Sequence, residues 1–243
     1  MTAEMRIAMW SGPRNISTAM LRAWENRADT SVIDEPFYGY YLQQTGAGHP
    51  GAGEIIAASE TNWRRIVAQL TGPIPNGRRI FYQKHMTHHL LPEISRDWLV
   101  QVQNCFLIRD PAEVIVSYAK KNSKPRLHDL GFVQQLDIFN CVRQGTGEVP
   151  PVVDAKDVLR NPGRILKLLC DAMGVEFDTN MLSWRAGRRD TDGVWAKYWY
   201  AEVERSTSFG RDRGQMTQVP RSLREMHMRS RAIYDELYKR RLR

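Results

Sequence analysis

The beginning of the chain constrains the fold most, because a strand there is followed by a short loop and then by a helix. Residues 5–10 are mostly apolar and have the length of a buried strand, which Ser11, Gly12 and Pro13 interrupt. Apolar residues then recur on one helical face: Ile16, Ala19, Met20, Ala23 and Trp24. We expect Ser11 or Asn15 to cap this helix. The arrangement aims free N–H groups and the positive end of a helix dipole at the loop, so it predicts a phosphate or sulfate site.

The loop differs from the nucleoside-triphosphate-binding loop G-x-x-x-x-G-K-[ST]. Gly12 is followed five and six residues later by Ser17 and Thr18, so the second glycine and the lysine are both missing. ATP is a poor fit without the lysine that reaches its β- and γ-phosphates. Arg14 adds a fixed charge with a planar fork of donors, which suits an anion. An ordinary strand-to-helix turn is the alternative interpretation.

The length of 243 residues suits one α/β domain over residues 1–243, or one domain with helical additions, and 42% hydrophobic residues are enough for a core. No apolar run of about 18 residues is present, so we expect no membrane-spanning helix, and no basic-then-apolar leader is visible. Cys105, Cys141 and Cys170 are far apart and form no C-x-x-C motif. They are expected to be reduced thiols of a cytoplasmic protein.

The net charge of +8 is concentrated near the end of the sequence, where residues 221–243 hold eight lysines and arginines against three acidic residues. Apolar residues recur on one stripe of the same segment, which predicts a docked helix with a basic outer side. No base-reading motif accompanies the charge, so nucleic acid is not the expected partner. An anionic small molecule explains the excess as well.

Short apolar runs that predict further strands alternate with segments of helical periodicity. The expected strands lie at 30–34, 79–83, 102–108 and 149–154, and the expected helices include 129–143 and 162–173. Strands that alternate with helices favour an α/β fold, in which helices flank a central, mainly parallel sheet.

Glu35 and Lys84 follow two of these strands directly. Glu35 precedes Pro36, and a residue before a proline is pushed into extended geometry. It should therefore sit at the carboxyl end of its strand, where ligands bind in open α/β sheets. A solvated loop acid is the alternative.

The segment 84–89 (KHMTHH) holds three of the six histidines. A metal site would need a third ligand and a supporting acid, and no H-E-x-x-H pattern is present, so we expect no metal. A loop that contributes polar groups to a cleft is the favoured interpretation.

Arg109 follows the strand at 102–108, and Ser117 lies eight residues further on, about two turns along a helix that begins at Pro111. Both side chains reach one anion if that helix folds back beside the loop. The alternative is a capping Asp110 next to a surface arginine.

Two other segments stand out by their composition but contain no recognisable motif. The glycine-rich stretch 46–53 predicts a flexible loop or lid. The aromatic residues within 187–203 are expected to pack in the core or under the C-terminal helix, with a substrate-facing wall as the alternative.

Three segments together resemble the sulfotransferase family. SGPRNIST (11–18) resembles its 5′-phosphosulfate loop, commonly P-[KR]-S-G-S/T-T, and FLIRDPAEVIVSY (106–118) is similar to its 3′-phosphate motif. VVDAKDVLRNPGRILKLLCDAMGVEFD (152–178) looks like the family's later segment of an acidic residue, D-[LV]-L, a proline and a helix that ends in glycine. The matches come in the family's order and span most of residues 7–178.

The resemblance implies a three-layer P-loop-type fold that binds 3′-phosphoadenosine 5′-phosphosulfate (PAPS) and sulfates a hydroxyl or amine of a small-molecule or carbohydrate acceptor. By position, the 5′-phosphosulfate would be held by Gly12, Pro13, Arg14, Asn15, Ser17 and Thr18. Arg109 and Ser117 would hold the 3′-phosphate. Ile16 stands where the loop usually has glycine, which puts a side chain against backbone that normally approaches the anion. No R-K-G-x-x-G-x-W motif is clear, and Arg211 and Arg213 are candidates for a late cofactor contact.

Sulfuryl transfer needs cations on the oxygens and a base for the acceptor proton. Arg14 and Lys84 are the candidate cations. Glu35 is the first choice of base, because family members that act on carbohydrates often place Glu-Pro after the second strand. Lys84 with His85 is the second choice, although the small-molecule branch has K-T-H where this chain has KHM. His88 is a further candidate, and no metal is required.

Two other functions compete with this one. A P-loop kinase or nucleotide hydrolase would share the fold, but its lysine is absent. A non-catalytic nucleotide-binding protein on the same fold is favoured by Ile16.

Overall fold

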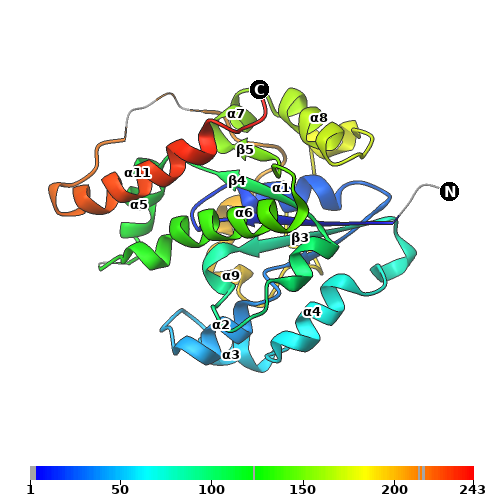
Figure 1. Cartoon of the computed structure of the whole chain (residues 1–243), viewed down its shortest axis with the longest axis horizontal. Coiled ribbons are helices and arrows are strands. Elements are labelled where there is room, and N and C mark those ends of the chain that lie inside the picture. The colour runs from blue at the N-terminus through cyan, green and yellow to red at the C-terminus, as the bar shows by residue number, and fades with distance from the viewer. Residues whose placement is uncertain (1–3, 123, 213, 215–216) are drawn as a thin grey trace.

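The computed structural model describes residues 4–122, 124–212, 214 and 217–243, and these residues form a five-stranded sheet at the centre of the molecule (Figure 1). The strand order is β2–β3–β1–β4–β5, and each neighbouring pair is parallel. The strands are β1 Met5–Ser11, β2 Thr30–Asp34, β3 Ile80–Met86, β4 Gln103–Ile108 and β5 Val152–Asp154. The predicted α/β fold with a mainly parallel central sheet is confirmed.

Helices follow most of the strands, as the periodicity predicts. The α-helices are α1 Ser17–Glu25, α2 Tyr38–Thr45, α3 Ala52–Ala57, α4 Trp63–Thr71, α5 Pro111–Ala119, α6 Phe132–Thr146, α7 Ala155–Arg160, α8 Pro162–Ala172, α9 Ala196–Trp199, α10 Ala201–Glu204 and α11 Arg224–Tyr238. Short 3₁₀ turns lie at Pro75–Gly77, Thr87–His89, Asp97–Gln101, Leu127–Leu130, Thr179–Leu182 and Arg221–Leu223. No helix within the described residues is both long enough and apolar enough to cross a membrane.

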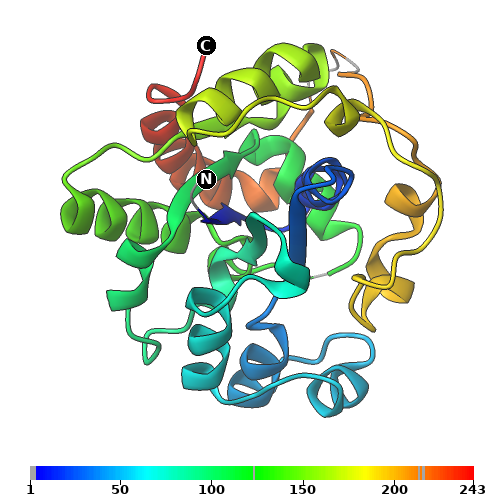
Figure 2. The same cartoon turned by 90° about the vertical axis from the view of Figure 1, so that its right-hand side faces the viewer.

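The sheet is buried on both faces, because its strands send alternate side chains to opposite sides. On one face Met9 and Tyr82 pack with residues of α1 and α8. On the other face Trp10 and Phe106 pack with residues of α2, α4 and α6. The helices therefore form two layers around the sheet, which Figure 2 shows from the side.

The basic C-terminal segment forms the docked helix α11. Its inner side buries Ser230, Tyr234 and Leu237, and the Tyr234 hydroxyl donates to Asp154 Oδ2 at 2.8 Å. The predicted stripe of apolar residues packs beside α5 and Leu130. The positive charges are left on the outer side of this helix.

Candidate active site

The loop between β1 and α1 packs closely against Leu130 and the end of β4. A Cβ atom on Gly12 would lie 2.6 Å from the Leu130 carbonyl oxygen, so only glycine fits this close approach. Arg14 has a left-handed backbone with φ of 56°. Asn15 Nδ2 donates to the Leu107 carbonyl at 3.0 Å, which ties the loop to the end of β4.

The N-terminus of α1 has no side-chain cap, so the predicted capping by Ser11 or Asn15 is wrong. The N-cap residue is Ile16, and the Asn15 amide oxygen accepts from the Ile16 N–H at 2.8 Å instead of from the first turn. Ile16 has an ordinary φ of −89°, and its side chain packs into the apolar cluster that also contains α1. This packing accommodates a side chain where the related loop has glycine. The first turn, with buried Ser17 and half-buried Thr18, thus presents N–H groups to a ligand.

Arg109 and Ser117, which lie about a hundred residues further along the chain, both contact Arg14. Arg109 Nη1 donates to the Arg14 carbonyl at 2.9 Å, and Arg14 Nε donates to Ser117 Oγ at 2.9 Å. Burial, together with the neighbouring Arg109 charge, lowers the pKa of Arg14. Glu113 binds the Arg109 guanidinium at 2.8 Å. The two segments, about a hundred residues apart, form one positively charged cradle, and such a cradle suits an anion.

The segment after β4 has one feature of each interpretation given above: the capping Asp110 and an Arg109 that reaches the β1–α1 loop. Asp110 caps α5 by accepting from the Ala112 N–H at 2.8 Å. Arg109 nevertheless points to the β1–α1 loop instead of outward, because its carbonyl partner on Arg14 lies there.

Glu35 follows β2 with a left-handed φ of 41°, so the predicted extended geometry before Pro36 is wrong. Its N–H still donates to the Lys84 carbonyl at 2.9 Å, which extends the β2–β3 pairing by one residue. The left-handed turn then brings its carboxylate to the Lys84 ammonium, at 2.5 Å. Left-handed backbone in a non-glycine residue is a strain that clusters at functional sites.

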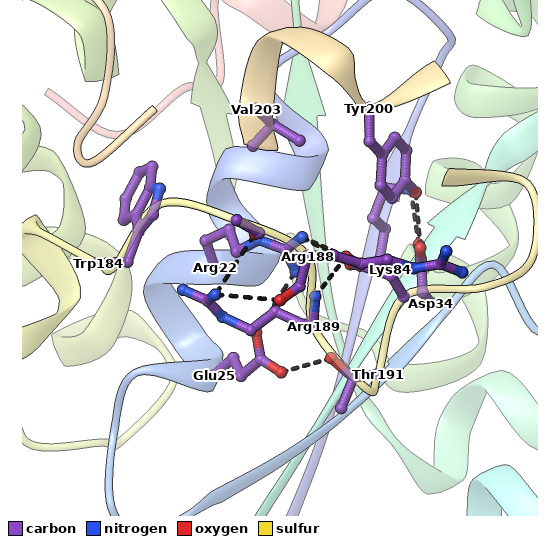
Figure 3. A network of polar contacts seen from close by, with 12 residues as sticks. Arg22, Glu25, Asp34, Lys84, Trp184, Arg188, Arg189, Thr191, Tyr200 and Val203 are labelled. Carbon is purple, nitrogen blue, oxygen red and sulfur yellow. Dashed lines mark hydrogen bonds and ion pairs between the residues drawn. The ribbon is translucent and has the colours of Figure 1, made fainter. Parts of the chain in front are cut away.

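Lys84 lies within β3, which runs to Met86 and not to Gln83 as predicted. Its ammonium donates to Asp34 Oδ1 at 2.7 Å and to the Tyr200 hydroxyl at 2.9 Å, in addition to Glu35. Figure 3 shows Lys84 beside Asp34 and Tyr200. Burial opposes the charged form, but Asp34 and Glu35 outweigh it and hold the pKa of Lys84 well above its usual range. Burial raises the pKa of Glu35, against the opposing charge of Lys84. A carboxyl group with a raised pKa is a better proton acceptor near neutral pH.

His85 lies on the opposite face of β3 from Lys84, because successive strand residues alternate. Its ring stacks on Trp10 with centroids 4.4 Å apart and is surrounded by Phe37 and Trp98. Burial and the Lys84 charge lower the pKa of His85 to about 3. These surroundings are those of a core residue, and they favour Glu35 over His85 as the candidate base.

His89 is the histidine that lies beside Glu35. Its ring stacks on Tyr38 and Tyr41, each at 4.7 Å, and its Nδ1 lies 3.8 Å from Glu35 Oε2. His88 is also buried, and burial lowers its pKa to about 3. The sequence pointed to the histidine segment as a source of polar groups, but the turn after β3 decides which of them faces Glu35.

The aromatic segment belongs to a loop, residues 184–207, that we call the Ω-loop. Its ends are joined by bonds from Trp184 N to Thr207 O at 2.9 Å and from Gly187 N to Glu204 O at 2.7 Å. In Figure 2 it is the yellow-to-orange segment along one side of the molecule. Trp195 and Tyr200 are buried in the same apolar cluster as Tyr38 of α2, which confirms the expected core packing for both, and the Trp195 ring meets Tyr38 at 5.4 Å. The Ω-loop therefore brings aromatic side chains to the carboxyl edge of the sheet.

A buried ion pair and a surface pair anchor the Ω-loop. Arg22 of α1 binds Asp192 at 2.6 Å with both side chains inaccessible, and Thr191 bonds Glu25 beside it (Figure 3). Lys197 binds Glu54 of α3 at 2.6 Å on the surface. Breaking a buried pair is far more costly than breaking a surface pair, so Arg22 and Asp192 are the main anchor.

A hollow of about 460 Å³ lies between the start of α8 and the segment after the Ω-loop. Its walls include Arg160, Pro162, Phe209, Gly210 and Arg211. Arg211, one candidate for a late cofactor contact, thus lines an open space, while Arg213 lies outside the described residues.

The parallel sheet makes this an α/β protein, and the cationic cradle lies at the carboxyl edge of the sheet, where ligands bind in open α/β folds. The chain matches the family model of the sulfotransferase domain over residues 5–240, and it belongs to that family. A sulfotransferase from Alicyclobacillus acidocaldarius has the same fold, with a TM-score of 0.57 at 11% identity over 99% of this chain and 98% of that chain. The sulfotransferase domain from the curacin biosynthetic pathway has a TM-score of 0.52 at 14% identity, over 100% of this chain and 93% of that chain.

Two curated relatives from Arabidopsis thaliana are similar over most of this chain. They are named branched-chain-amino-acid aminotransferase-like proteins 1 and 2, and are 31% identical over 231 residues and 30% over 203 residues. The matches cover 95% and 84% of this chain but 41% and 36% of those proteins. The chain spans less than half the length of these relatives.

Proposed function

We propose that this sulfotransferase domain moves the sulfuryl group of PAPS to a hydroxyl or amine of a small-molecule or carbohydrate acceptor. The observation that carries the proposal is the contact between the two anion-binding segments, in which Arg109 and Ser117 both bond to Arg14. A nucleotide with charged groups at its 5′ and 3′ positions needs two such segments side by side.

The donor set fits that nucleotide. The uncapped start of α1 offers N–H groups to the 5′-phosphosulfate, with the Arg14 guanidinium beside them. Arg109 and Ser117 are placed for the 3′-phosphate on the other side of Arg14. PAPS supplies the activated sulfuryl group, and the protein supplies position and positive charge.

Glu35 is the proposed base. Its Oε1 is held by Lys84, so Oε2 is the oxygen that takes the proton of the acceptor hydroxyl or amine. Lys84 stays charged between two carboxylates and keeps Glu35 in place. Arg14 and the first turn of α1 stabilise the negative charge that develops on the bridging oxygen of the leaving phosphate, as its bond to sulfur breaks and the acceptor atom bonds to sulfur.

Calorimetry without magnesium tests the donor assignment. Adenosine 3′,5′-bisphosphate should bind more tightly than ADP or ATP, because only the former carries the 3′-phosphate. Preferential binding of ATP in the presence of magnesium would instead favour a kinase or nucleotide hydrolase. A screen of acceptors with ³⁵S-labelled PAPS then tests transfer: binding without transfer to any acceptor would favour the non-catalytic alternative.

A further inference from the structure

Tyr200 connects the Ω-loop to the candidate active site. Its hydroxyl lies 2.9 Å from Lys84 Nζ and 2.6 Å from Asp34 Oδ2, and Trp195 Nε1 donates to it at 3.2 Å. The three groups Lys84, Asp34 and Tyr200 are all buried. Figure 3 shows the Tyr200 ring descending from the Ω-loop to Asp34 beside Lys84. No sequence pattern links residues 34, 84 and 200.

The directions of these hydrogen bonds follow from a count of hydrogens. An ammonium group has three donors and no acceptor, while a hydroxyl has one donor and two acceptor sites. Ionised Asp34 can only accept, so the Tyr200 hydrogen goes to Asp34 and Lys84 must donate to the Tyr200 oxygen. The three ammonium hydrogens of Lys84 are therefore donated to Asp34, Glu35 and Tyr200.

Lys84 consequently has no hydrogen left for a transferred group in this arrangement. Without the Tyr200 oxygen, one ammonium hydrogen would be unpaired in a buried place, and it would turn to any new acceptor nearby. With that oxygen present, the ammonium stays directed at the two carboxylates. The second oxygen of Asp34, Oδ2, accepts the Tyr200 hydrogen, so Glu35 Oε2 is the carboxylate oxygen of this group that bonds neither Lys84 nor Tyr200.

We propose that Tyr200 is a positioning residue of the site: it occupies the third hydrogen of Lys84, so that Lys84 orients Glu35 instead of contacting the sulfuryl group. This inference rests on the proposed function and revises the expectation that Lys84 places its charge on the sulfuryl oxygens. The cationic role then falls to Arg14 and the start of α1. The Ω-loop thus contributes the Tyr200 side chain to the site, and the buried Arg22–Asp192 pair holds the loop in place.

An NMR experiment on the full chain tests the geometry without any acceptor. A buried ammonium with three bonded hydrogens exchanges slowly with water, so wild type should show a Lys84 ¹H–¹⁵N ammonium signal near pH 6.5 that is absent in Lys84→Arg. Tyr200→Phe should lose or strongly broaden this signal, because one hydrogen is released. Absence of the signal in wild type, or its persistence in Tyr200→Phe, would overturn the proposal. The wild-type spectrum keeps the test valid even where Tyr200→Phe does not fold.

Tyr234→Phe is the matched control, since Tyr234 is a second buried tyrosine that donates to a buried aspartate, Asp154, at 2.8 Å. It should leave the Lys84 signal unchanged while lowering the unfolding midpoint about as much as Tyr200→Phe does. A loss of the Lys84 signal in both variants would mean that general destabilisation causes it, and would refute the specific role of Tyr200.

Turnover with the acceptor found in the PAPS screen gives the second measurement. Tyr200→Phe should lower kcat by about 10- to 100-fold, the effect of one hydrogen bond to a charged group, while KM for PAPS stays the same. Tyr234→Phe should keep wild-type kcat. A higher KM for PAPS with unchanged kcat would overturn the positioning role. Failure of the proposed function would show itself differently, as an intact NMR result with no sulfate transfer in wild type.

Discussion

The two ends of the candidate site differ in how completely their charges are satisfied. At the acceptor end, the Lys84 ammonium binds three groups of the protein, two of them carboxylates. At the donor end, the Arg14 guanidinium bonds through Nε to a neutral hydroxyl and lies next to a second arginine that lowers its pKa further. The acceptor end is complete by itself, whereas the donor end carries excess positive charge that an anion would balance.

This difference separates two kinds of preorganisation. At the proposed acceptor end, the proposed base Glu35 is held in place because the Lys84 ammonium is hydrogen-bonded to it, to Asp34 and to Tyr200. The donor end stores unfavourable charge repulsion and open helix N–H groups, and these become favourable only when a ligand binds. Changes at the acceptor end should therefore alter turnover, and changes at the donor end should alter binding.

The largest expected effect is at the acceptor end. Glu35→Gln keeps an oxygen for Lys84 but removes the base, so kcat should fall by about 10²–10⁴-fold. Affinity for adenosine 3′,5′-bisphosphate in calorimetry should stay at the wild-type value. Glu148→Gln, at an exposed position, is the control. Wild-type turnover in Glu35→Gln would remove Glu35 as the base and, with it, the proposed division between the two ends.

Arg109→Ala tests the donor end. Removing a charged partner from a desolvated anion should weaken binding of adenosine 3′,5′-bisphosphate by about 2–5 kcal/mol in calorimetry. Arg65→Ala, on the exposed side of α4, should bind like wild type. Arg109→Lys should fall between them, because it keeps the charge but lacks the planar fork. If Arg109→Ala binds as tightly as wild type, the 3′-phosphate has been assigned to the wrong residue.

Gly12→Ala sharpens the comparison by disturbing only the shape of the donor loop. The new methyl carbon would lie 2.6 Å from the Leu130 carbonyl oxygen. Because the methyl group is fixed to the backbone of residue 12 and its neighbour is also backbone, one of the two segments must move. Such overpacking should lower the free energy of unfolding by about 1–3 kcal/mol in urea titrations and weaken nucleotide binding. Gly48→Ala has no atom within 4 Å of the added carbon and should be neutral. Equal stability of the two variants would show that the close approach at Gly12 is unimportant.

The most gradual effect is spread over several pH units and concerns the buried histidines near the proposed acceptor end. Burial lowers the pKa of His85 to about 3, far below its value of about 6.5 in an unfolded chain. Above pH 6.5 this histidine is neutral in the folded and the unfolded state, so it does not make the free energy of unfolding depend on pH. Below pH 6.5 the unfolded chain binds a proton that the folded chain does not, so stability falls with pH by up to ~1.4 kcal/mol per unit until the folded pKa is reached.

Urea unfolding of wild type and His85→Gln between pH 7 and pH 5 measures how much His85 contributes to the pH dependence of stability. Wild type should lose stability more steeply than His85→Gln as the pH falls, because the variant lacks one group that titrates only when unfolded. His88, with its pKa lowered by burial to about 3, should behave in the same way. Parallel pH profiles for wild type and His85→Gln would mean that His85 is accessible to protons in the folded protein.

Local sequence patterns were sufficient for the sheet, most helices and the donor end. The loop at 12–18 and Arg109 could be placed at one edge from the sequence, because each follows a strand and parallel strands have their carboxyl ends at the same edge. Ser117 followed from its place about two turns along the next helix. The meeting of Arg109 with Arg14 follows from that topology.

The acceptor end could be predicted only in part. Glu35 and Lys84 were identified from their positions near strand ends, but the left-handed backbone at Glu35 and the continuation of β3 through His85 were not. Polar residues interrupt an apolar pattern even where partners from elsewhere satisfy them, so the sequence signal for a strand ends too early.

By itself the sequence determined the order of the elements and the residues that lie at the edge of the sheet, because hydrophobic periodicity and loop residues act locally. The tertiary structure decided which of those residues share hydrogen bonds. Lys84 meets Tyr200 only because the Ω-loop folds back over the edge, and His89 faces Glu35 only because a 3₁₀ turn follows β3. Such contacts depend on where the chain returns in space, and side-chain partners from distant segments leave no periodic trace in the sequence.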